Sequence, residues 1–563
     1  MSRISCGRLL ARALKKQGVE VVFTISGAQV MSMLHGCKDE GIEIIDVRHE
    51  GAGAHAADAY AKASGKMAAV MAMSGPGITN TVTSMLEAIT TGSPLLMIGG
   101  CTAVFDNETG EMQDCNTLAT MATVTKWAKK CYQGKRVGEY VTMAVREAWA
   151  GTPGPVYLEV PMDVSHSYVE ESEIVIPEFT RHIKQPCGNM DLIKEAAKLL
   201  VNAKQPVISI GDSARYQTEG KEFVKELVKY LDIPTNVQLV ARGAFANEKE
   251  EPLFTIGLGA MAHADVILEL STENNYIMGK GKSPFINKDA RVIQVHTDSR
   301  LIGYNTPAHL GIVGGVCEVC EQILSVVKEM TPPKTNPEWI AKATKLLNDV
   351  AGGYVEGFNN EDYPIHPGRL AKEIFKFMDN HKEDWSVATD GGDCRQWVNN
   401  NMKINRPGKL ISVGPLGPMG MGTPFTLGSY VANKKPVIYY TGDGSFGFYP
   451  MELDTCERVG ANVITIIAND SAWGMVKMYD KAINKNNVER HGFVASELPF
   501  MRSYEKFAET WGGLGFVVEK IEDLIPAMNK IYESGKPGII NVKISQTAMS
   551  PRTKMFATMQ PYE

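Results

Sequence analysis

The chain has 563 residues, a formal net charge of −6, and 44% hydrophobic residues. This length predicts about three or four domains, each with an ample core. The mild negative charge argues against a nucleic-acid or membrane surface, so phosphorylated ligands would be held by local amides, a metal or a few basic residues.

The N-terminus does not have the pattern of a signal peptide, and no apolar run is long enough to span a bilayer. The ten cysteines are scattered singly. Only Cys317 and Cys320 are spaced like a metal or redox pair, but they fall on a helical pattern and no second pair exists. We therefore predict a cytoplasmic protein whose thiols are reduced and buried.

Residues 1–165 alternate between segments of helical spacing and short β-rich runs, such as residues 21–25, 43–47 and 67–73. This alternation predicts a doubly wound parallel sheet. Ligands of such sheets collect at the carboxyl ends of the strands, here near Gly27, Glu50 and residues 75–77.

Two more α/β units follow, at about residues 191–330 and 363–548. Less regular segments at 166–190 and 331–362 separate the units. The tail, residues 549–563, is predicted as a disordered end or as a lid over a site. The sequence thus predicts an α/β protein of three doubly wound parallel-sheet domains.

The third unit carries the main site signal. A buried run at 436–440 ends at Gly442-Asp443-Gly444-Ser445, and a second run at 463–468 ends at Asn469-Asp470. Adjacent parallel strands would bring Asp443 and Asp470 to one sheet edge, where oxygen ligands can hold Mg²⁺ and a diphosphate. Gly444 and Ser445 are predicted to open a helix whose N-terminal amides favour phosphate. Alone, an Asp-Gly turn is most often only a turn.

Several motifs together resemble the thiamin diphosphate enzymes, in particular acetolactate synthases, benzaldehyde lyase and 2-hydroxyacyl-CoA lyases. Gly442-Asp443-Gly444, then 24 residues, then Asn469-Asp470 is similar to their cofactor motif. Similar segments are Arg48-His49-Glu50, Ser74-Gly75-Pro76-Gly77 with Asn80, and Gly417-Pro418-Met419-Gly420. The resemblance covers essentially the whole chain.

The resemblance implies a pyrimidine-binding, a central and a diphosphate-binding domain, in that order. It implies thiamin diphosphate and Mg²⁺ as cofactors, small carbonyl compounds as substrates, and a homodimer or homotetramer with active sites between chains. The central domain is the place for an ADP or CoA moiety. Neither a nucleic acid nor a membrane is expected as a partner.

The resemblance also assigns roles to single residues. Glu50 would be the catalytic carboxylate at the cofactor's aminopyrimidine, and Met419 the apolar wedge between its two rings. Gln113 matches a glutamine that faces the substrate, and Gln29 stands where benzaldehyde lyase has a histidine, so both are candidate catalytic residues. The implied metal ligands are Asp443, Asp470 and the Ala472 main-chain oxygen; the family usually has Asn at position 470. The other implied cofactor-binding residues are Gly75, Asn80, Gly391, Gly392, Gly417, Gly442, Gly444, Ser445, Trp473, Gly474 and Met475.

The implied reaction is cleavage or formation of a C–C bond through an enamine (Breslow) intermediate, on 2-hydroxy ketones, 2-keto acids or 2-hydroxyacyl-CoA. Acetolactate synthase is the alternative, although Met478-Tyr479 replaces the Gln-Trp expected there. Arg552 and Lys554 could bind a CoA phosphate if the tail folds over the site. Two other classes are an NAD-dependent oxidoreductase, for which Gly257 and Gly259 are too sparse a fingerprint, and a non-catalytic nucleotide-binding relative.

Overall fold

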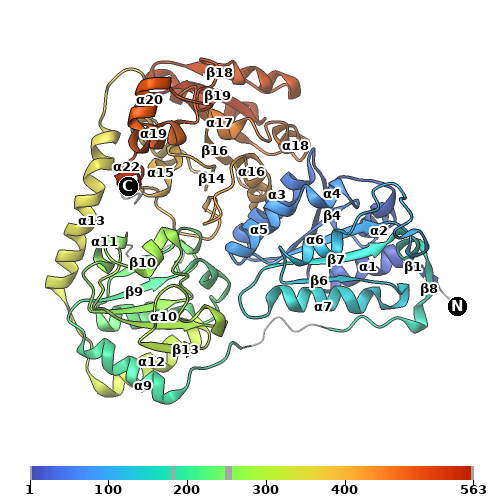
Figure 1. The fold of residues 1–563 in the computed structure, drawn as a ribbon, viewed down its shortest axis with the longest axis horizontal. Coiled ribbons are helices and arrows are strands. Elements are labelled where there is room, and N and C mark those ends of the chain that lie inside the picture. The colour runs from blue at the N-terminus through green and yellow to red at the C-terminus, as the bar shows by residue number, and fades with distance from the viewer. Residues whose placement is uncertain (1–2, 179–183, 247–256, 559–563) are drawn as a thin grey trace.

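The computed structural model describes residues 3–178, 184–246 and 257–558. These residues form three parallel β-sheets flanked by helices, and one small antiparallel pair. The three units are blue, green and orange to red along the chain in Figure 1. The predicted fold class, three α/β domains with parallel sheets, is confirmed.

The first sheet has the strand order β3-β2-β4-β5-β7-β6. Helical crossovers cover both faces, which is why its strands are continuous apolar runs rather than alternating ones. Its strands are β2 (Val21–Thr24), β3 (Glu43–Asp46), β4 (Ala68–Ala72), β5 (Leu95–Cys101), β6 (Trp127–Lys130) and β7 (Pro155–Pro161). Its helices are α1 (Cys6–Lys16), α2 (Ala28–Asp39), α3 (Glu50–Ser64), α4 (Pro76–Thr79), α5 (Val82–Thr90), α6 (Thr117–Ala122), α7 (Val137–Trp149) and α8 (Met162–His166).

The central sheet has the order β10-β9-β11-β12-β13. Cys317 and Cys320 lie buried on helix α12, and burial raises the pKa of both thiols, so they are inert core residues. The strands are β9 (Pro206–Ile210), β10 (Thr235–Val237), β11 (Val266–Leu270), β12 (Arg291–His296) and β13 (Leu310–Val313). The helices are α9 (Met190–Asn202), α10 (Lys221–Leu231), α11 (Gly257–Met261) and α12 (Val316–Met330).

The third sheet has the order β15-β14-β16-β17-β19-β18. The predicted strands that end at Asp443 and Asp470 are therefore neighbours, as expected. The strands are β14 (Ser386–Thr389), β15 (Leu410–Ile411), β16 (Val437–Gly442), β17 (Val463–Asn469), β18 (Gly515–Val518) and β19 (Gly538–Lys543). The helices are α14 (Pro367–Asp379), α15 (Cys394–Asn399), α16 (Gly422–Asn433), α17 (Asp443–Phe446), α18 (Glu452–Arg458), α19 (Gly474–Ile483), α20 (Lys485–His491) and α21 (Leu524–Ser534).

The segments between the units are partly structured. Within residues 166–190, strand β8 (Tyr168–Glu170) pairs antiparallel with β1 (Arg3–Ser5). Residues 331–362 hold one long helix, α13 (Pro337–Phe358), which is yellow in Figure 1. The tail forms helix α22 (Pro551–Thr558), and its residues 559–563 lie outside the described part of the chain.

Helices α3 and α16 join the first unit to the third, and they lie side by side in Figure 1. Their small residues allow the two backbones to touch: a Cβ atom at Gly428 would overlap the carbonyl oxygen of Ala56. Side chains of both helices, such as Tyr60 and Phe425, belong to one shared core cluster. This packing explains the Ala-rich composition of α3 and fixes the helix that carries Glu50 at its start.

A cluster of buried charges reinforces the same junction. The Lys62 ammonium lies 2.7 Å from a carboxylate oxygen of Asp58 and 3.6 Å from one of Glu87, and all three side chains are inaccessible to solvent. Glu87 also accepts a hydrogen bond of 2.5 Å from the Gly414 amide of the third unit. The first unit thus holds the start of the loop that leads to Met419.

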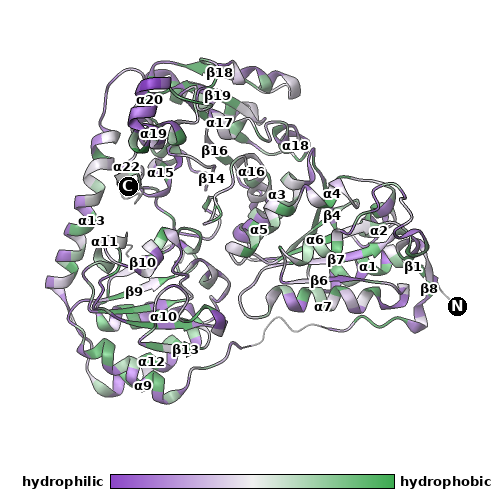
Figure 2. Cartoon of the chain, in the orientation of Figure 1, coloured by the Kyte–Doolittle hydropathy of each residue, from purple (hydrophilic) through white to green (hydrophobic). Residues whose placement is uncertain are grey.

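The most polar segments of the chain lie at its surface. Figure 2 shows α20 almost entirely purple, and none of its residues is buried. Within the three described ranges, no helix combines the length and apolar character needed to cross a membrane.

Candidate functional site

A small cavity of about 80 Å³ lies at the carboxyl ends of β14, β16 and β17 in the third unit. Parallel pairing sets Gly442 opposite Ala468, so the segments that follow both strands meet at one edge of the sheet. The structure brings together twelve of the predicted residues around this cavity: Gly391, Gly392, Met419, Gly442, Asp443, Gly444, Ser445, Asp470, Ala472, Trp473, Gly474 and Met475. Gly417 does not line it.

Asp443 and Asp470 form a pair of carboxyl groups in this cavity. Burial raises the pKa of both, and the neighbouring Asp443 charge raises that of Asp470 further. The Asp443 Oδ1 atom is buried without a hydrogen-bond donor. Two carboxylates and a nearby carbonyl oxygen are hard ligands that fit Mg²⁺. No group of three or more His, Cys, Asp or Glu side chains suited to a metal occurs in the described ranges.

Two glycines let the walls of the cavity close tightly around this pair. A Cβ atom at Gly474 would overlap the Asp470 carboxylate. A Cβ atom at Gly444 would lie 2.6 Å from the Trp473 ring. Gly444 and Ser445 belong to the single-turn helix α17, and the longer helix α18 begins only at Glu452. The predicted helix after the Asp-Gly turn is therefore two separate helices.

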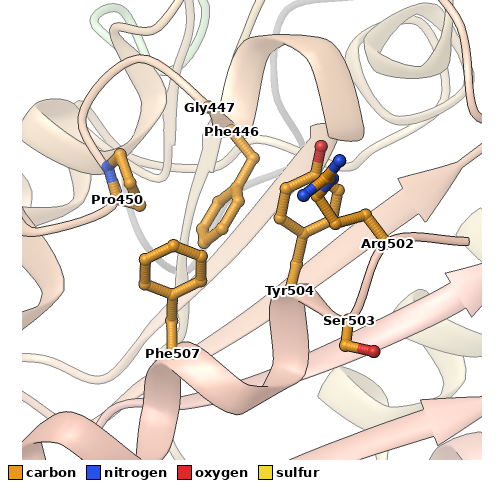
Figure 3. A pocket seen from close by; sticks show the side chains of 7 residues that line it. All are labelled: Phe446, Gly447, Pro450, Arg502, Ser503, Tyr504 and Phe507. Carbon is orange, nitrogen blue, oxygen red and sulfur yellow. The ribbon is translucent and has the colours of Figure 1, made fainter. Parts of the chain in front are cut away.

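Aromatic side chains pack together next to the turn at residues 442–445. Phe446 has no exposed surface, and its ring lies 5.6 Å from Tyr504 and 6.3 Å from Phe507 between ring centroids. Figure 3 shows these rings around a second cavity of about 540 Å³. None of its lining residues was predicted from the sequence, because they come from segments some 50 residues apart that only the fold brings together.

Met419 stands at the rim of the cavity with 40% of its surface exposed. The glycines on both sides, Gly417 and Gly420, have φ angles of 67° and 86°, which side chains rarely tolerate. The Met419 Cγ atom would lie 3.1 Å from a Cβ atom placed on Gly391.

The predicted residues of the first unit form a second cluster. Glu50 begins α3, and its Oε2 atom accepts a hydrogen bond of 3.0 Å from the Asn80 side chain. Nearby, Gln29 accepts a hydrogen bond from the Ser74 amide. The Ser74 hydroxyl in turn donates to the Gln113 carbonyl oxygen, so these residues surround the end of β4.

Gln113 and Gly75 are in close contact within this cluster. A Cβ atom on Gly75, whose φ is 66°, would lie 3.2 Å from the Gln113 Cβ atom. Gln113 itself has a φ of 63°, and its buried side-chain oxygen has no hydrogen-bond donor. A strained residue with an unpaired polar atom is a frequent feature of ligand sites.

The two clusters lie on different units of the same chain. All residues that line the 80 Å³ cavity come from residues 367–553 of the described chain, so neither Glu50 nor Gln113 reaches it. In the described ranges, the Glu50 cluster therefore forms no part of the lining around Asp443 and Asp470.

The tail contributes residues that sequence reasoning did not assign. The cavity is lined in part by Ile544, Ser545, Ala548, Met549 and Thr553. The Asp393 carboxylate accepts hydrogen bonds from the Ser550 amide and hydroxyl. Because these partners are 157 positions apart, no local pattern in the sequence indicates the contact.

Two arginines lie next to the cavity, one beside Cys394 and one beside Thr553, both lining residues. Burial lowers the pKa of Arg395 and of Arg552, and their mutual repulsion lowers that of Arg552 further. The Nε atom of Arg395 is buried without an acceptor. This positive pair next to the cavity favours an anionic ligand.

Comparison with known families assigns the three units. Residues 4–120 match the thiamine pyrophosphate enzyme N-terminal TPP binding domain, residues 193–323 the central domain, and residues 390–542 the C-terminal TPP binding domain. Thiamine pyrophosphate is another name for thiamin diphosphate.

Curated relatives match nearly the whole chain. An acetolactate synthase large subunit of Mycobacterium tuberculosis is 27% identical over 554 residues, covering 98% of both chains. The 2-hydroxyacyl-CoA lyase 2 of Danio rerio is 25% identical, covering 96% of this chain and 92% of the relative. The oxalyl-CoA decarboxylase of Escherichia coli is 26% identical, covering 96% and 95%. With all three domains matched in order, the chain belongs to the family of thiamin diphosphate-dependent enzymes.

Proposed function

We propose that this enzyme is a thiamin diphosphate- and Mg²⁺-dependent lyase or carboligase, which breaks or forms C–C bonds next to a carbonyl group. The observation that carries the proposal is the single cavity at which a carboxylate pair, a Met-bearing loop and close-packed glycines meet. When bound, thiamin diphosphate would supply a carbon atom that attacks the substrate's carbonyl group. Its positively charged ring would then stabilise the negative charge that develops on the former carbonyl carbon.

The residues of the third unit would bind the polar half of the cofactor. Asp443, Asp470 and the Ala472 carbonyl oxygen would hold Mg²⁺, whose charge offsets that of the diphosphate. Met419 would contact the organic half as the apolar wedge, because its side chain is exposed at the rim. The glycines leave room for a ligand to approach the backbone closely.

Glu50 of a second copy of the chain would complete the site. Its carboxyl group would hold a proton at a ring nitrogen of the cofactor, with Asn80 fixing its direction. This arrangement is supported by the lining of the cavity, to which residues 367–553 contribute and Glu50 and Asn80 do not. We accordingly propose a homodimer or homotetramer with each active site between two chains.

The arginine pair supports an anionic substrate, either a 2-keto acid or a CoA thioester. A 2-hydroxyacyl-CoA would use Arg552 for a phosphate, and the central domain for the nucleotide part. Acetolactate synthesis from pyruvate is the second candidate, favoured by the relative of that name.

Thermal-shift measurement followed by product analysis tests the proposal. Thiamin diphosphate with Mg²⁺ should raise the melting temperature, whereas NAD should not. The loaded protein is then incubated with pyruvate, benzoin, 2-hydroxyacyl-CoA and formaldehyde, and products are identified by mass spectrometry. A protein that binds the cofactor but consumes none of them would contradict the proposed activity.

A further inference from the structure

The loop that carries Met419 is held by a carboxylate that no sequence motif singled out. Asp390 follows strand β14 and has no exposed surface. Its Oδ1 atom accepts hydrogen bonds from the amides of Gly391 (2.6 Å) and Gly420 (2.9 Å). Its Oδ2 atom accepts from the Gly422 amide (2.8 Å) and the Tyr439 hydroxyl (3.1 Å).

This pattern favours an ionised carboxylate. Three of the four partners are backbone amides, which can only donate, and the Tyr439 hydroxyl can donate as well. Burial alone raises the pKa of Asp390, and the four hydrogen bonds oppose that effect. A group buried in this way contributes to stability only because all its acceptor positions are used.

The loop at residues 414–422 depends on hydrogen bonds to other parts of the chain for its conformation. Gly417 and Gly420 on both sides of Met419 have positive φ angles, and glycine loses the most conformational freedom on ordering. The exposed Met419 side chain has few neighbours that could fix it. The start of the loop is held by Glu87 through the Gly414 amide, and its end by Asp390 through Gly420 and Gly422.

We infer that Asp390 is the positioning residue for the Met419 wedge and for the Gly391 wall of the cofactor cavity. One carboxylate holds the amide of Gly391 and the loop just after Met419, so it sets the spacing between the two surfaces that would enclose the cofactor. This inference rests on the proposed function. The distance between the reacting groups of a bound cofactor would depend on the spacing between Met419 and Gly391.

The test compares Asp390→Asn with Asp384→Asn. Asn has nearly the same shape, but its NH₂ group would face two of the four donors. Asp384 lies two residues before the start of β14, where it pairs with Arg406, Lys409 and Lys435. The control thus removes a partly buried carboxylate near the other end of this strand, away from the loop.

Two measurements are made on the full-length protein. The first is hydrogen exchange of cofactor-free protein, followed by mass spectrometry of the peptide spanning 414–422; we expect faster exchange in Asp390→Asn and wild-type exchange in Asp384→Asn. The second is deuterium exchange at C2 of thiamin diphosphate, at saturating cofactor and Mg²⁺. It should slow by about 10- to 100-fold in Asp390→Asn only, the effect of misplacing a reacting group by about 1 Å.

Wild-type C2 exchange in Asp390→Asn, or equal slowing in both variants, would overturn the inference. If Asp390→Asn does not fold, Tyr439→Phe removes one of the four donors, and C2 exchange should then slow by a smaller factor; no change would likewise overturn it. A wild-type protein that does not bind thiamin diphosphate would refute the proposed function instead. The hydrogen-exchange comparison would still show whether Asp390 holds the loop at residues 414–422.

Discussion

At the scale of single residues, the site contains two carboxyl groups in a buried environment that raises the pKa of both. Asp443 and Asp470 share a cavity where burial disfavours ionisation of both, and a bound proton or cation relieves the repulsion between them. Glu50, in the other unit, accepts a hydrogen bond from the Asn80 side-chain amide. These carboxyl groups therefore lead to separate predictions.

Replacing Glu50 with Gln should lower turnover by about 10²- to 10⁴-fold, the usual contribution of a group that holds or moves a proton. Cofactor binding, measured by fluorescence titration, should be retained because the shape is unchanged. Glu43→Gln is the matched control, since Glu43 is an exposed residue of the same unit that pairs only with Lys434. Full turnover in Glu50→Gln would exclude the assigned role.

Replacing Asp470 with Asn should change how the stability of the metal-free protein depends on pH. Burial and Asp443 raise the pKa of Asp470 to about 8, so the folded protein binds more protons than the unfolded chain between about pH 4 and pH 8. The wild type should then lose stability as pH rises through this window, and the part of the loss due to Asp470 is at most about 1.4 kcal/mol per pH unit. In Asp470→Asn this loss should shrink.

Melting curves at pH 6 and pH 8.5, with a chelator present, measure the effect. The melting temperature of the variant should exceed that of the wild type at pH 8.5 by more than at pH 6. Added Mg²⁺ should reverse the order at pH 8.5, because the second carboxylate then binds the cation. Parallel pH profiles of the two proteins would show that Asp470 does not titrate in this window.

At the scale of secondary-structure elements, the contact between α3 and α16 determines how the first and third units meet. The helices approach so closely at Gly428 and Ala56 that no side chain fits between them. This feature was visible in the sequence only as an Ala- and Gly-rich composition, because the partner helix lies over 350 residues away.

Gly428→Ala should destabilise the protein by about 1–3 kcal/mol, since overpacking forces backbones apart. Gly352→Ala is the contrasting variant: Gly352 also lies in a helix, α13, but has open space around it. There alanine should stabilise by up to about 1 kcal/mol through helix propensity. Thermal unfolding of both variants measures whether each substitution lowers or raises the stability. If Gly428→Ala left the stability unchanged, α3 and α16 would be able to move apart.

Most of the fold could be predicted from periodicity, and the exceptions have physical causes. Strands β4, β16 and β17 are apolar runs that end at glycine or polar residues, and the sequence predicts each to within about two residues. Strands β6 and β18 lie at the edges of their sheets, are partly exposed, and were not predicted. The single-turn helix α4, which ends just before Asn80, was not predicted either.

The site could be predicted in part for a similar reason. The residues around Asp443 and Asp470 follow their strands directly, so topology alone brings them together. Asp390 and the Ser550–Asp393 contact depend on long-range packing, which leaves no local pattern.

At the scale of the whole molecule, the proposed assembly predicts complementation between inactive variants. Glu50→Gln and Asp443→Asn should each be inactive alone. In a mixed dimer, one site would combine Glu50 of one chain with Asp443 of the other, and so would be intact. A re-equilibrated equal mixture should therefore regain about a quarter of wild-type turnover if the dimer has two-fold symmetry.

Activity of the mixture is assayed against each variant alone, after co-refolding or co-expression. The pair Glu50→Gln with Glu50→Asp serves as the control, because no mixed site can be intact there. Absence of recovery in stable mixed dimers would place the whole site within one chain.

The hydrogen bonds between Ser550 and Asp393 have a practical consequence for handling the protein. Helix α22 begins directly after Ser550 and carries Thr553, which lines the cavity, whereas β1 lies on the opposite side of the molecule in Figure 1. Fluorophores or immobilisation linkers should therefore be attached near β1, since bulk added to α22 would lie next to the cavity.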